Sequence, residues 1–388
     1  MRLNSEDIHL TYCLNAHPGE SWEENIRAIR ENACAVRDIV CPGERFGLGL
    51  RLGKQAVDDM RRPRKIAELT SLLERENLYV FTVNAFPYGT FHTSPVKENV
   101  YRPDWTEPAR VDYTIQVARI LSELLPEGVA GSVSTVPVSY KGFRLGKNDL
   151  ERACASIAHV AKELAAIHAR AGKHITLALE PEPDCVLETI DECVAFYQDT
   201  LIPGAARNDC PEHLIRRHIG ICFDTAHAAV EFEPFIPAME KLRAAGIPIA
   251  KIQISSALTA RGAPESLAAL RPFREPVYLH QTRVRDAGGA VARFADLPEA
   301  LATLAPDPGQ DWRVHYHVPL FWRGGDTLGS TSNQIPEAVR HALDNRLTSH
   351  FEIETYTFTV LPPSLAPETL SDGIAREFLW LLPLISSG

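Results

Sequence analysis

Three carboxylates and one amide occur at or near the ends of short apolar runs in the sequence. Asp224 directly follows the run Ile-Gly-Ile-Cys-Phe, Glu180 follows Ile-Thr-Leu-Ala-Leu, and Gln253 and Glu354 occur in two further runs. Runs of this length predict strands that are buried on both faces, as in a parallel sheet. Because ligands bind at the carboxyl ends of parallel strands, these four side chains are candidates for one shared site.

A divalent cation would allow these acidic side chains to coexist. Carboxylates that are brought close together repel one another, and each loses hydration when it is buried. Oxygen ligands, with one imidazole, suit Mn²⁺, Mg²⁺, Co²⁺ or Zn²⁺. We therefore predict that Glu180, Asp224, Gln253 and Glu354 hold such an ion. Taken singly, each Glu also suits a solvated loop or a helix cap, and Asp224 also suits a buried carboxylate bonded to backbone amides.

Further polar side chains are candidates for contacts to a substrate. His315 and His317 alternate in Val-His-Tyr-His-Val, so both point to the same side of a predicted strand. Two histidines are costly to bury without partners, and the alternative is that they lie on an exposed face. The residues that we expect to contact a substrate are Asn15, His17, Asn84, His92, His280, His315, His317 and Arg323.

Strand-like runs alternate with helical segments along most of the chain. The runs are residues 8–14, 46–52, 78–83, 129–136, 175–179, 219–223, 249–254 and 351–356. This alternation predicts parallel β-α-β units, and eight such units close into a (β/α)8 TIM barrel, an α/β fold. We predict a single barrel over residues 1–388. Residues 258–347 contain two more runs, 277–284 and 313–321, and are predicted to form an inserted hairpin or subdomain on the catalytic rim, between strands seven and eight.

Composition limits the classes of function and partner. The chain has 388 residues, of which 45% are hydrophobic, and a formal net charge of -10, which argues against nonspecific nucleic-acid binding. Its apolar runs are shorter than the roughly 18 residues of a membrane helix, and its N-terminus lacks the pattern of a signal peptide. We therefore expect a cytoplasmic protein with no membrane span. Its expected partner is a small-molecule substrate or metabolite. The sequence leaves open whether the protein forms a homo-oligomer.

The sequence lacks several motifs of other enzyme classes. It contains no Gly-x-x-x-x-Gly-Lys-Ser/Thr loop, no Gly-x-Gly-x-x-Gly after the first strand, and no Gly-x-Ser-x-Gly. Nucleotide-dependent transfer, hydride transfer and serine hydrolase chemistry are therefore disfavoured. The 8 cysteines are scattered and include no Cys-x-x-Cys pair, which argues against a zinc ribbon.

The chain resembles the xylose isomerase-like TIM-barrel superfamily, which includes sugar isomerases, ketose epimerases and barrel-type apurinic endonucleases. The motifs that carry this resemblance are Leu179-Glu180, Asp224-Thr-Ala-His227 and Ile353-Glu354-Thr355. Over nearly the whole chain, the sequence looks more closely like the EboE family of bacterial metabolite-traffic proteins. That likeness rests on Leu10-Thr-Tyr-Cys-Leu-Asn-Ala-His-Pro-Gly-Glu-Ser-Trp22, Asp224-Thr-Ala-His-Ala-Ala-Val-Glu-Phe232, Lys251-Ile-Gln-Ile-Ser-Ser-Ala257, Tyr278-Leu-His-Gln281, His315-Tyr-His-Val-Pro319 and Glu352-Ile-Glu-Thr-Tyr356.

The resemblance implies roles for the residues at the strand ends. In the epimerase branch, Glu, Asp, His and Glu from strands five to eight hold a divalent metal, and the two Glu residues act as acid and base. Carried over, Glu180, Asp224 and Glu354 are ligands, Glu180 and Glu354 are catalytic, and His227 is the catalytic histidine beside the metal. Gln253 stands where the branch has histidine. The metal therefore binds differently, uses His280, His315 or His317 from the insertion, or is absent.

Three functions remain open at the level of the sequence. The leading hypothesis is a divalent-metal-dependent isomerase or epimerase that acts on a polyhydroxylated small molecule or a secondary-metabolite precursor. A non-catalytic barrel that binds or escorts a metabolite is the first alternative. The second alternative is a metal-dependent phosphoester hydrolase, which is disfavoured because multi-zinc sites need more histidines at strand ends than the eight predicted strands supply.

Overall fold

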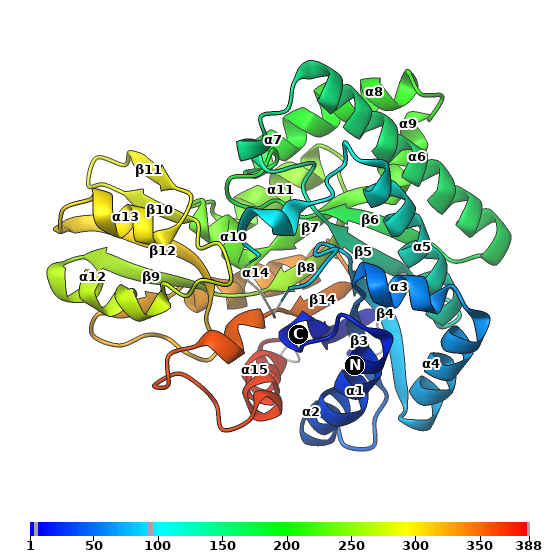
Figure 1. Ribbon diagram of the computed structural model, residues 1–388, viewed down its shortest axis with the longest axis horizontal. Coiled ribbons are helices and arrows are strands. Elements are labelled where there is room, and N and C mark those ends of the chain that lie inside the picture. Colours follow the sequence, from blue (N-terminus) through cyan, green and yellow to red (C-terminus); the bar gives the residue numbers. More distant parts are fainter. Residues whose placement is uncertain (4–6, 92–95, 386–388) are drawn as a thin grey trace.

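The computed structural model describes residues 1–3, 7–91 and 96–385, and its main element is a nearly closed barrel (Figure 1). Nine strands form one sheet in the order β1-β2-β14-β8-β7-β6-β5-β4-β3, in which β1 (Arg2–Leu3) pairs antiparallel with β2. A parallel bridge between Cys13 and Gly49 joins the two ends of the parallel array. The parallel strands are β2 (Ile8–Tyr12), β3 (Phe46–Arg51), β4 (Leu78–Asn84), β5 (Gly131–Thr135), β6 (Ile175–Leu179), β7 (Ile219–Asp224), β8 (Ile249–Ile254) and β14 (His350–Ile353). The prediction of an α/β TIM barrel is confirmed.

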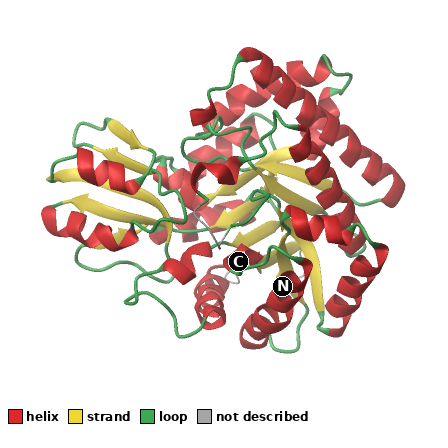
Figure 2. Ribbon diagram, in the orientation of Figure 1, coloured by secondary structure: helices red, strands yellow, loops and turns green. Residues whose placement is uncertain are grey.

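Helices surround these strands (Figure 2). They bury one apolar face against the sheet, as the charged amphipathic α4 shows with buried Leu69, Leu72 and Leu73. The helices around the barrel are α1 (Trp22–Ala28), α2 (Cys34–Val40), α3 (Lys54–Met60), α4 (Pro63–Arg75), α5 (Pro108–Leu124), α6 (Lys147–Ala171), α7 (Ile190–Ala195), α8 (Ile202–Ala206), α9 (Glu212–His218), α10 (Thr225–Val230), α11 (Phe235–Ala244), α14 (Ile335–Asp344) and α15 (Leu370–Ile385). None of the helices in the described ranges is both long and apolar enough to cross a membrane.

A buried ion pair fills the barrel interior below the strand ends. Lys251 on β8 donates to the carboxylate of Glu352 on β14 and, over 3.2 Å, to Thr82 Oγ1. The side chains of Lys251 and Glu352 are fully buried. Position 49 on β3 requires glycine because a Cβ there would overlap with Oε1 of Glu352. Gly49 therefore makes room for the charged pair, whereas the other glycine of β3, Gly47, makes room for Phe81.

A second, antiparallel sheet follows β8 in the chain and lies beside the barrel (Figure 1). Its order is β11-β10-β12-β9-β13, and α12 (Pro264–Leu270) and α13 (Leu297–Thr303) pack with it. The runs expected at 277–284 and 313–321 are strands with shifted bounds, and three further strands were not expected. The five strands are β9 (Ala257–Gly262), β10 (Thr282–Arg285), β11 (Val291–Phe294), β12 (Asp307–His317) and β13 (Leu328–Ser330).

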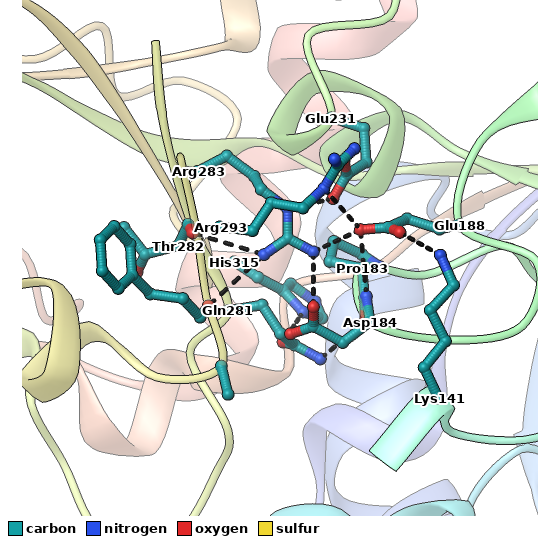
Figure 3. A network of polar contacts seen from close by, with 12 residues as sticks. Lys141, Pro183, Asp184, Glu188, Glu231, Gln281, Thr282, Arg283, Arg293 and His315 are labelled. Atoms are coloured by element: carbon teal, nitrogen blue, oxygen red, sulfur yellow. Dashed lines mark hydrogen bonds and ion pairs between the residues drawn. The ribbon is translucent and has the colours of Figure 1, made fainter. Parts of the chain in front are cut away.

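Arg283 on β10 connects this second sheet to the barrel (Figure 3). Its fully buried guanidinium contacts Asp184 at 2.8 Å and Glu231 at 2.6 Å, and it also donates to Glu188. Asp184 and Glu188 follow β6, and Glu231 follows α10, so all three carboxylates belong to the barrel's carboxyl-end loops. Burial raises the pKa of Glu231 to about 8.

Candidate metal centre and active site

Asp224 ends β7 and caps α10. Its Oδ1 accepts hydrogen bonds from His227 N at 2.8 Å and from Ser255 Oγ at 2.7 Å. Its Oδ2 is buried and has no hydrogen-bond partner among the described residues. Burial acts to raise the pKa of Asp224, but His227 and His317 hold it below its usual value. Oδ1 of Asp224 is thus bonded to a backbone amide, as one of the two sequence interpretations expects, whereas Oδ2 is available to a ligand.

Glu180 and Glu354 lie near Asp224, and each directly follows a strand of the barrel, β6 and β14 respectively. Glu180 follows β6, and burial raises its pKa to about 7. Glu354 follows β14, one residue beyond the end of the strand. Its Oε1 accepts from Asn15 Nδ2 at 2.6 Å and from Asn84 Nδ2 at 3.1 Å. Burial, with the nearby Glu180 and Asp224, raises the pKa of Glu354 well above its usual value. The structure thus brings the three predicted acids together.

Three imidazoles face this carboxylate cluster, and each is held by its Nδ1 atom. Carbonyl oxygens only accept hydrogen bonds, so each Nδ1 carries a proton, and in the neutral ring each Nε2 presents a lone pair. Burial acts to lower the pKa of His227, but Asp224, Glu182 and Glu180 hold it above its usual value. The Nδ1 atoms of His227, His315 and His317 lie 2.8 Å from Pro181 O, Gln281 Oε1 and Glu354 O, respectively. Burial lowers the pKa of His317 to about 4, which keeps this ring neutral. The three rings are therefore arranged as metal ligands are.

The ligand atoms of these six residues form three groups. Within each group, all ligand atoms lie within 4.8 Å of one another. The groups are Glu180 with Asp224 and His227, Asp224 with His317 and Glu354, and His227 with His315 and His317. His317 comes from β12 of the second sheet, and so the insertion supplies an imidazole to the mouth of the barrel.

A cavity opens above this cluster. Its polar lining includes Asn15, Asn84, Glu180, Glu182, His227, His315 and Glu354. Its walls are mostly aromatic and include Phe86, Phe91, Tyr101, Tyr278 and Tyr356. Phe91, Tyr278 and Tyr356 pack together, with ring centroids 5.0 to 5.4 Å apart. A ligand would therefore meet polar groups at the floor and aromatic rings along the sides.

Other predicted site residues lie elsewhere. His17 is buried and bonds to Tyr12 OH at 2.9 Å. His280 uses both ring nitrogens, on His315 O at 3.1 Å and Glu275 Oε1 at 2.7 Å, so it has no free lone pair for a metal. Arg323 is exposed in the segment before β13, and it is not among the described residues that line the cavity. His92 lies outside the described residues.

Gln253 is fully buried in β8, in register with Asp224 on β7 and Glu352 on β14. It does not line the cavity in the part of the chain that the structure describes. Glu182, which the sequence analysis did not select, is also a cavity residue. It accepts from Tyr101 OH at 2.7 Å and is 6% exposed. The aromatic walls could not be found from the sequence, because their members come from separate loops.

The comparisons with known proteins show the fold of the chain. No model of a known protein family matches the sequence, and no curated protein matches it. The solved structures that resemble it include the IOLI protein with a binding zinc atom, at 11% identity over 98% of each chain and a TM-score of 0.50. A D-tagatose 3-epimerase-like protein has 14% identity, covers 97% of this chain and 98% of its own, and has a TM-score of 0.49. A xylose isomerase domain protein from Planctomyces limnophilus has 13% identity, covers 97% of this chain and 96% of its own, and has a TM-score of 0.49. The likeness to the IOLI protein supports the α/β barrel fold of this chain.

Proposed function

We propose that this protein is a divalent-metal-dependent isomerase or epimerase. Its substrate would be a polyhydroxylated small molecule, and the EboE-like motifs favour a precursor of a secondary metabolite. The observation that carries this proposal is the convergence of Glu180, Asp224 and Glu354 with buried imidazoles, beside a cavity that Glu180, His227 and Glu354 line. Such a set of buried acids is costly unless a cation or a proton compensates each charge.

The residues present fit a divalent cation. Oε2 of Glu180, Oδ2 of Asp224 and Nε2 of His317 are buried, and none has a hydrogen-bond partner within the described ranges. Asp224 would hold the ion, together with either Glu180 and His227 or His317 and Glu354, because the ligand atoms of each of these two groups lie within 4.8 Å of one another. Mixed carboxylate and imidazole ligands suit Mn²⁺, Co²⁺ and Zn²⁺. When bound, the ion would act as a Lewis acid on a substrate oxygen.

Glu180 and Glu354 are placed to transfer a proton. Both line the cavity, and they approach it from different strands. Glu180, with its pKa raised to about 7, accepts a proton from the carbon beside a substrate carbonyl and exists in both forms near neutral pH. For epimerisation, protonated Glu354 returns a proton to the opposite face of the same carbon. For isomerisation, Glu180 returns its own proton to the former carbonyl carbon, and the proton of the neighbouring hydroxyl passes to the former carbonyl oxygen.

Asn15 and Asn84 position Glu354, and His227 orients the substrate. Both asparagine amides donate to the same oxygen, Oε1, so the second carboxylate oxygen of Glu354 is left to face the metal or the substrate. The Nε2 atom of His227 lies 4.0 Å from Asp224 Oδ1, at the edge of the cavity. A substrate hydroxyl that bonds to His227 would therefore sit next to the carboxylates.

Proton exchange with solvent tests the proposal. The purified protein with Mn²⁺ is incubated in D₂O with a panel of ketoses and cyclic polyols that bear a ketone, and deuterium at carbon is measured by NMR. We expect incorporation that is abolished by a chelator and reduced at least 100-fold in Glu180→Gln and in Glu354→Gln. Absence of exchange for every compound, with metal bound, would refute the enzyme. Ligand binding without exchange would favour a protein that escorts a metabolite.

A second candidate function is metal-dependent hydrolysis of a phosphoester. It is favoured by the imidazoles of His315 and His317, which the second sheet brings to the barrel mouth. Zinc loading followed by release of 4-nitrophenol from 4-nitrophenyl phosphate and its bis ester separates the two functions. Turnover of these esters, without deuterium exchange in the ketose panel, would establish the hydrolase in place of the isomerase.

A further inference from the structure

The cavity at the mouth of the barrel has two chemically different parts. Its acidic end is formed by Glu180, Glu182 and Glu354, together with the rings of His227 and His315. The rest of its lining consists largely of apolar side chains and tyrosine rings, which include Phe86, Phe91, Val96, Val100, Tyr278 and Tyr356. A ligand that fills the cavity therefore contacts both kinds of surface.

Phe91, Tyr278 and Tyr356 form an aromatic wall that is separate from the main hydrophobic core. Their ring centroids lie 5.0 to 5.4 Å apart, and each residue is at most 8% exposed. Phe91 follows β4, Tyr278 precedes β10 and Tyr356 follows β14, so the barrel and the second sheet both contribute to the wall. Rings that already pack on one another lose little freedom when a ligand binds, which favours binding.

The aromatic wall begins at the acidic end of the cavity. The ring of Tyr356 packs on the ring of His317, with their centroids 4.6 Å apart. Tyr356 also follows Glu354 by two residues in the chain. A ligand whose carbonyl and hydroxyl groups bind among the acids would therefore place its remaining atoms against the wall.

The charges around the cavity do not suit an anionic substrate. Among the described residues that line it, Lys97 is the only lysine or arginine. Its Nζ atom lies 2.7 Å from Asp296 Oδ2 and 2.7 Å from the carbonyl oxygen of Tyr278, so its charge is already paired. A phosphate on the substrate would face the carboxylates of the acidic end without a free cation beside it. The body of the substrate is therefore uncharged.

The sides of the cavity also offer few hydrogen bonds to a sugar. The hydroxyl of Tyr101 donates to Glu182 Oε1 at 2.7 Å and accepts from Gln281 Nε2 at 2.7 Å. Phe86 and Phe91 have no polar side-chain atom. A ligand hydroxyl that is buried against these rings loses its hydration and gains no partner, which costs free energy. A compound with a hydroxyl on every carbon therefore suits the acidic end alone.

We propose that the substrate is a hydroxy ketone that carries an uncharged aromatic ring. Its polyhydroxylated part occupies the acidic end of the cavity, and its ring packs against the aromatic wall. Edge-to-face and offset contacts between rings stabilise such a complex beyond the burial of apolar area. A ring is favoured over a flexible chain because it has fewer rotatable bonds to order in a preformed site. This inference rests on the proposed function, because the ketone is the group that Glu180 and Glu354 act on.

Three hydroxy ketones with the same head test this inference. Hydroxyacetone, 2-hydroxyacetophenone and 1-hydroxyoctan-2-one carry a methyl, a phenyl and a hexyl group on the same carbonyl. Calorimetry measures their binding to the full-length protein with Mn²⁺. We expect the phenyl ketone to bind at least about 30-fold more tightly than hydroxyacetone, because its ring leaves water for an apolar surface. We also expect it to bind more tightly than the hexyl ketone.

Variants of the aromatic wall locate the ring. Phe91→Leu and Tyr278→Leu keep an apolar side chain but remove the ring, so each should reduce the preference for phenyl over methyl by about 5-fold. Phe143→Leu is the matched control, because Phe143 packs under the guanidinium of Arg102 at 3.9 Å and is not among the described residues that line the cavity. This variant should keep the preference. Circular dichroism verifies that each variant is folded, and one folded wall variant is sufficient.

The outcomes separate this inference from the proposed function. A phenyl ketone that binds no more tightly than hydroxyacetone, or does not bind, would overturn the inference, and deuterium exchange in ketoses would then leave the isomerase standing. Tighter binding of the hexyl ketone, or a preference that is unchanged in both wall variants, would also overturn it. The expected preference without deuterium exchange in any compound would support the aromatic substrate and count against the isomerase.

Discussion

Replacing Arg283 by Met should weaken the attachment of the second sheet to the barrel. The guanidinium is fully buried and contacts Asp184 at 2.8 Å, Glu231 at 2.6 Å and Glu188. Removing one partner of a buried ion pair costs about 3–5 kcal/mol, because the remaining charge is left unpaired. Arg293 lies 3.3 Å from Glu231 Oε2 and 3.5 Å from Glu188 Oε1, so part of the negative charge stays compensated. We therefore expect the free energy of unfolding to fall by an amount at the lower end of this range, about 3 kcal/mol.

Urea unfolding, followed by tryptophan fluorescence, measures this loss. Trp312 on β12 is fully buried and reports on the second sheet directly. The matched control is Arg285→Met on the same strand, since Arg285 is 40% exposed and pairs with Asp311 at 3.2 Å. An exposed pair contributes about 0–1 kcal/mol, so this control should stay close to the wild type.

The effect of Arg283→Met should also reach the metal site. β10 pairs directly with β12, which carries His315 and His317, so loosening β10 disturbs both imidazoles. We expect faster proteolysis within residues 257–330 and weaker Mn²⁺ binding. The reasoning is refuted if Arg283→Met and Arg285→Met have equal unfolding free energies, or if Arg283→Met loses less than about 1 kcal/mol.

Three further predictions concern the barrel itself. Gly49→Ala should lower the melting temperature strongly because its Cβ overlaps with Glu352, whereas Gly89→Ala, where a Cβ meets nothing within 4 Å, should not. Burial raises the pKa of Glu377 to about 8, above the roughly 4.3 of an unfolded Glu, so the unfolding free energy should fall as pH rises from about 4.3 to 8. Urea unfolding at pH 5 and pH 8 should show this fall in the wild type and less of it in Glu377→Gln; an equal fall in both would contradict the assignment. Glu180, with a pKa raised to about 7, must lose its proton to bind a cation, so calorimetry should show tighter Mn²⁺ binding at pH 8 than at pH 6, and equal affinities would argue against Glu180 as a ligand.

The barrel could be predicted because its strands have a simple signature. Most of the parallel strands are buried on both faces and read as short apolar runs, and helices alternate with them along the chain. The second sheet does not have this signature. β9 reads Ala-Leu-Thr-Ala-Arg-Gly, β11 has two exposed residues out of four, and β13 has three residues. Short antiparallel strands with one solvated face give too little periodicity to be identified in advance.

The acids of the site could be predicted, whereas the choice among histidines could not. Glu180 and Asp224 directly follow apolar strands, so their approximate position is a consequence of the fold. Whether a histidine offers a lone pair depends on its partners, and these are far away in the sequence. His280 is bonded at both nitrogens, by Glu275 and by the backbone of residue 315, while His317 is bonded only at Nδ1 among the described residues. The sequence argument against a multi-metal hydrolase counted strand-end histidines, whereas His315 and His317 come from β12 of the second sheet.

Anomalous diffraction from a crystal soaked in Mn²⁺ tests the central claim most directly. We expect a strong anomalous peak at the mouth of the barrel, about 2.0–2.3 Å from Asp224 Oδ2 and within bonding distance of Glu180 or Glu354. Under the same conditions, a crystal of Asp224→Asn should show a much weaker peak or none. A wild-type crystal with the three carboxylates gathered as described and no anomalous density between them would contradict the metal-dependent function.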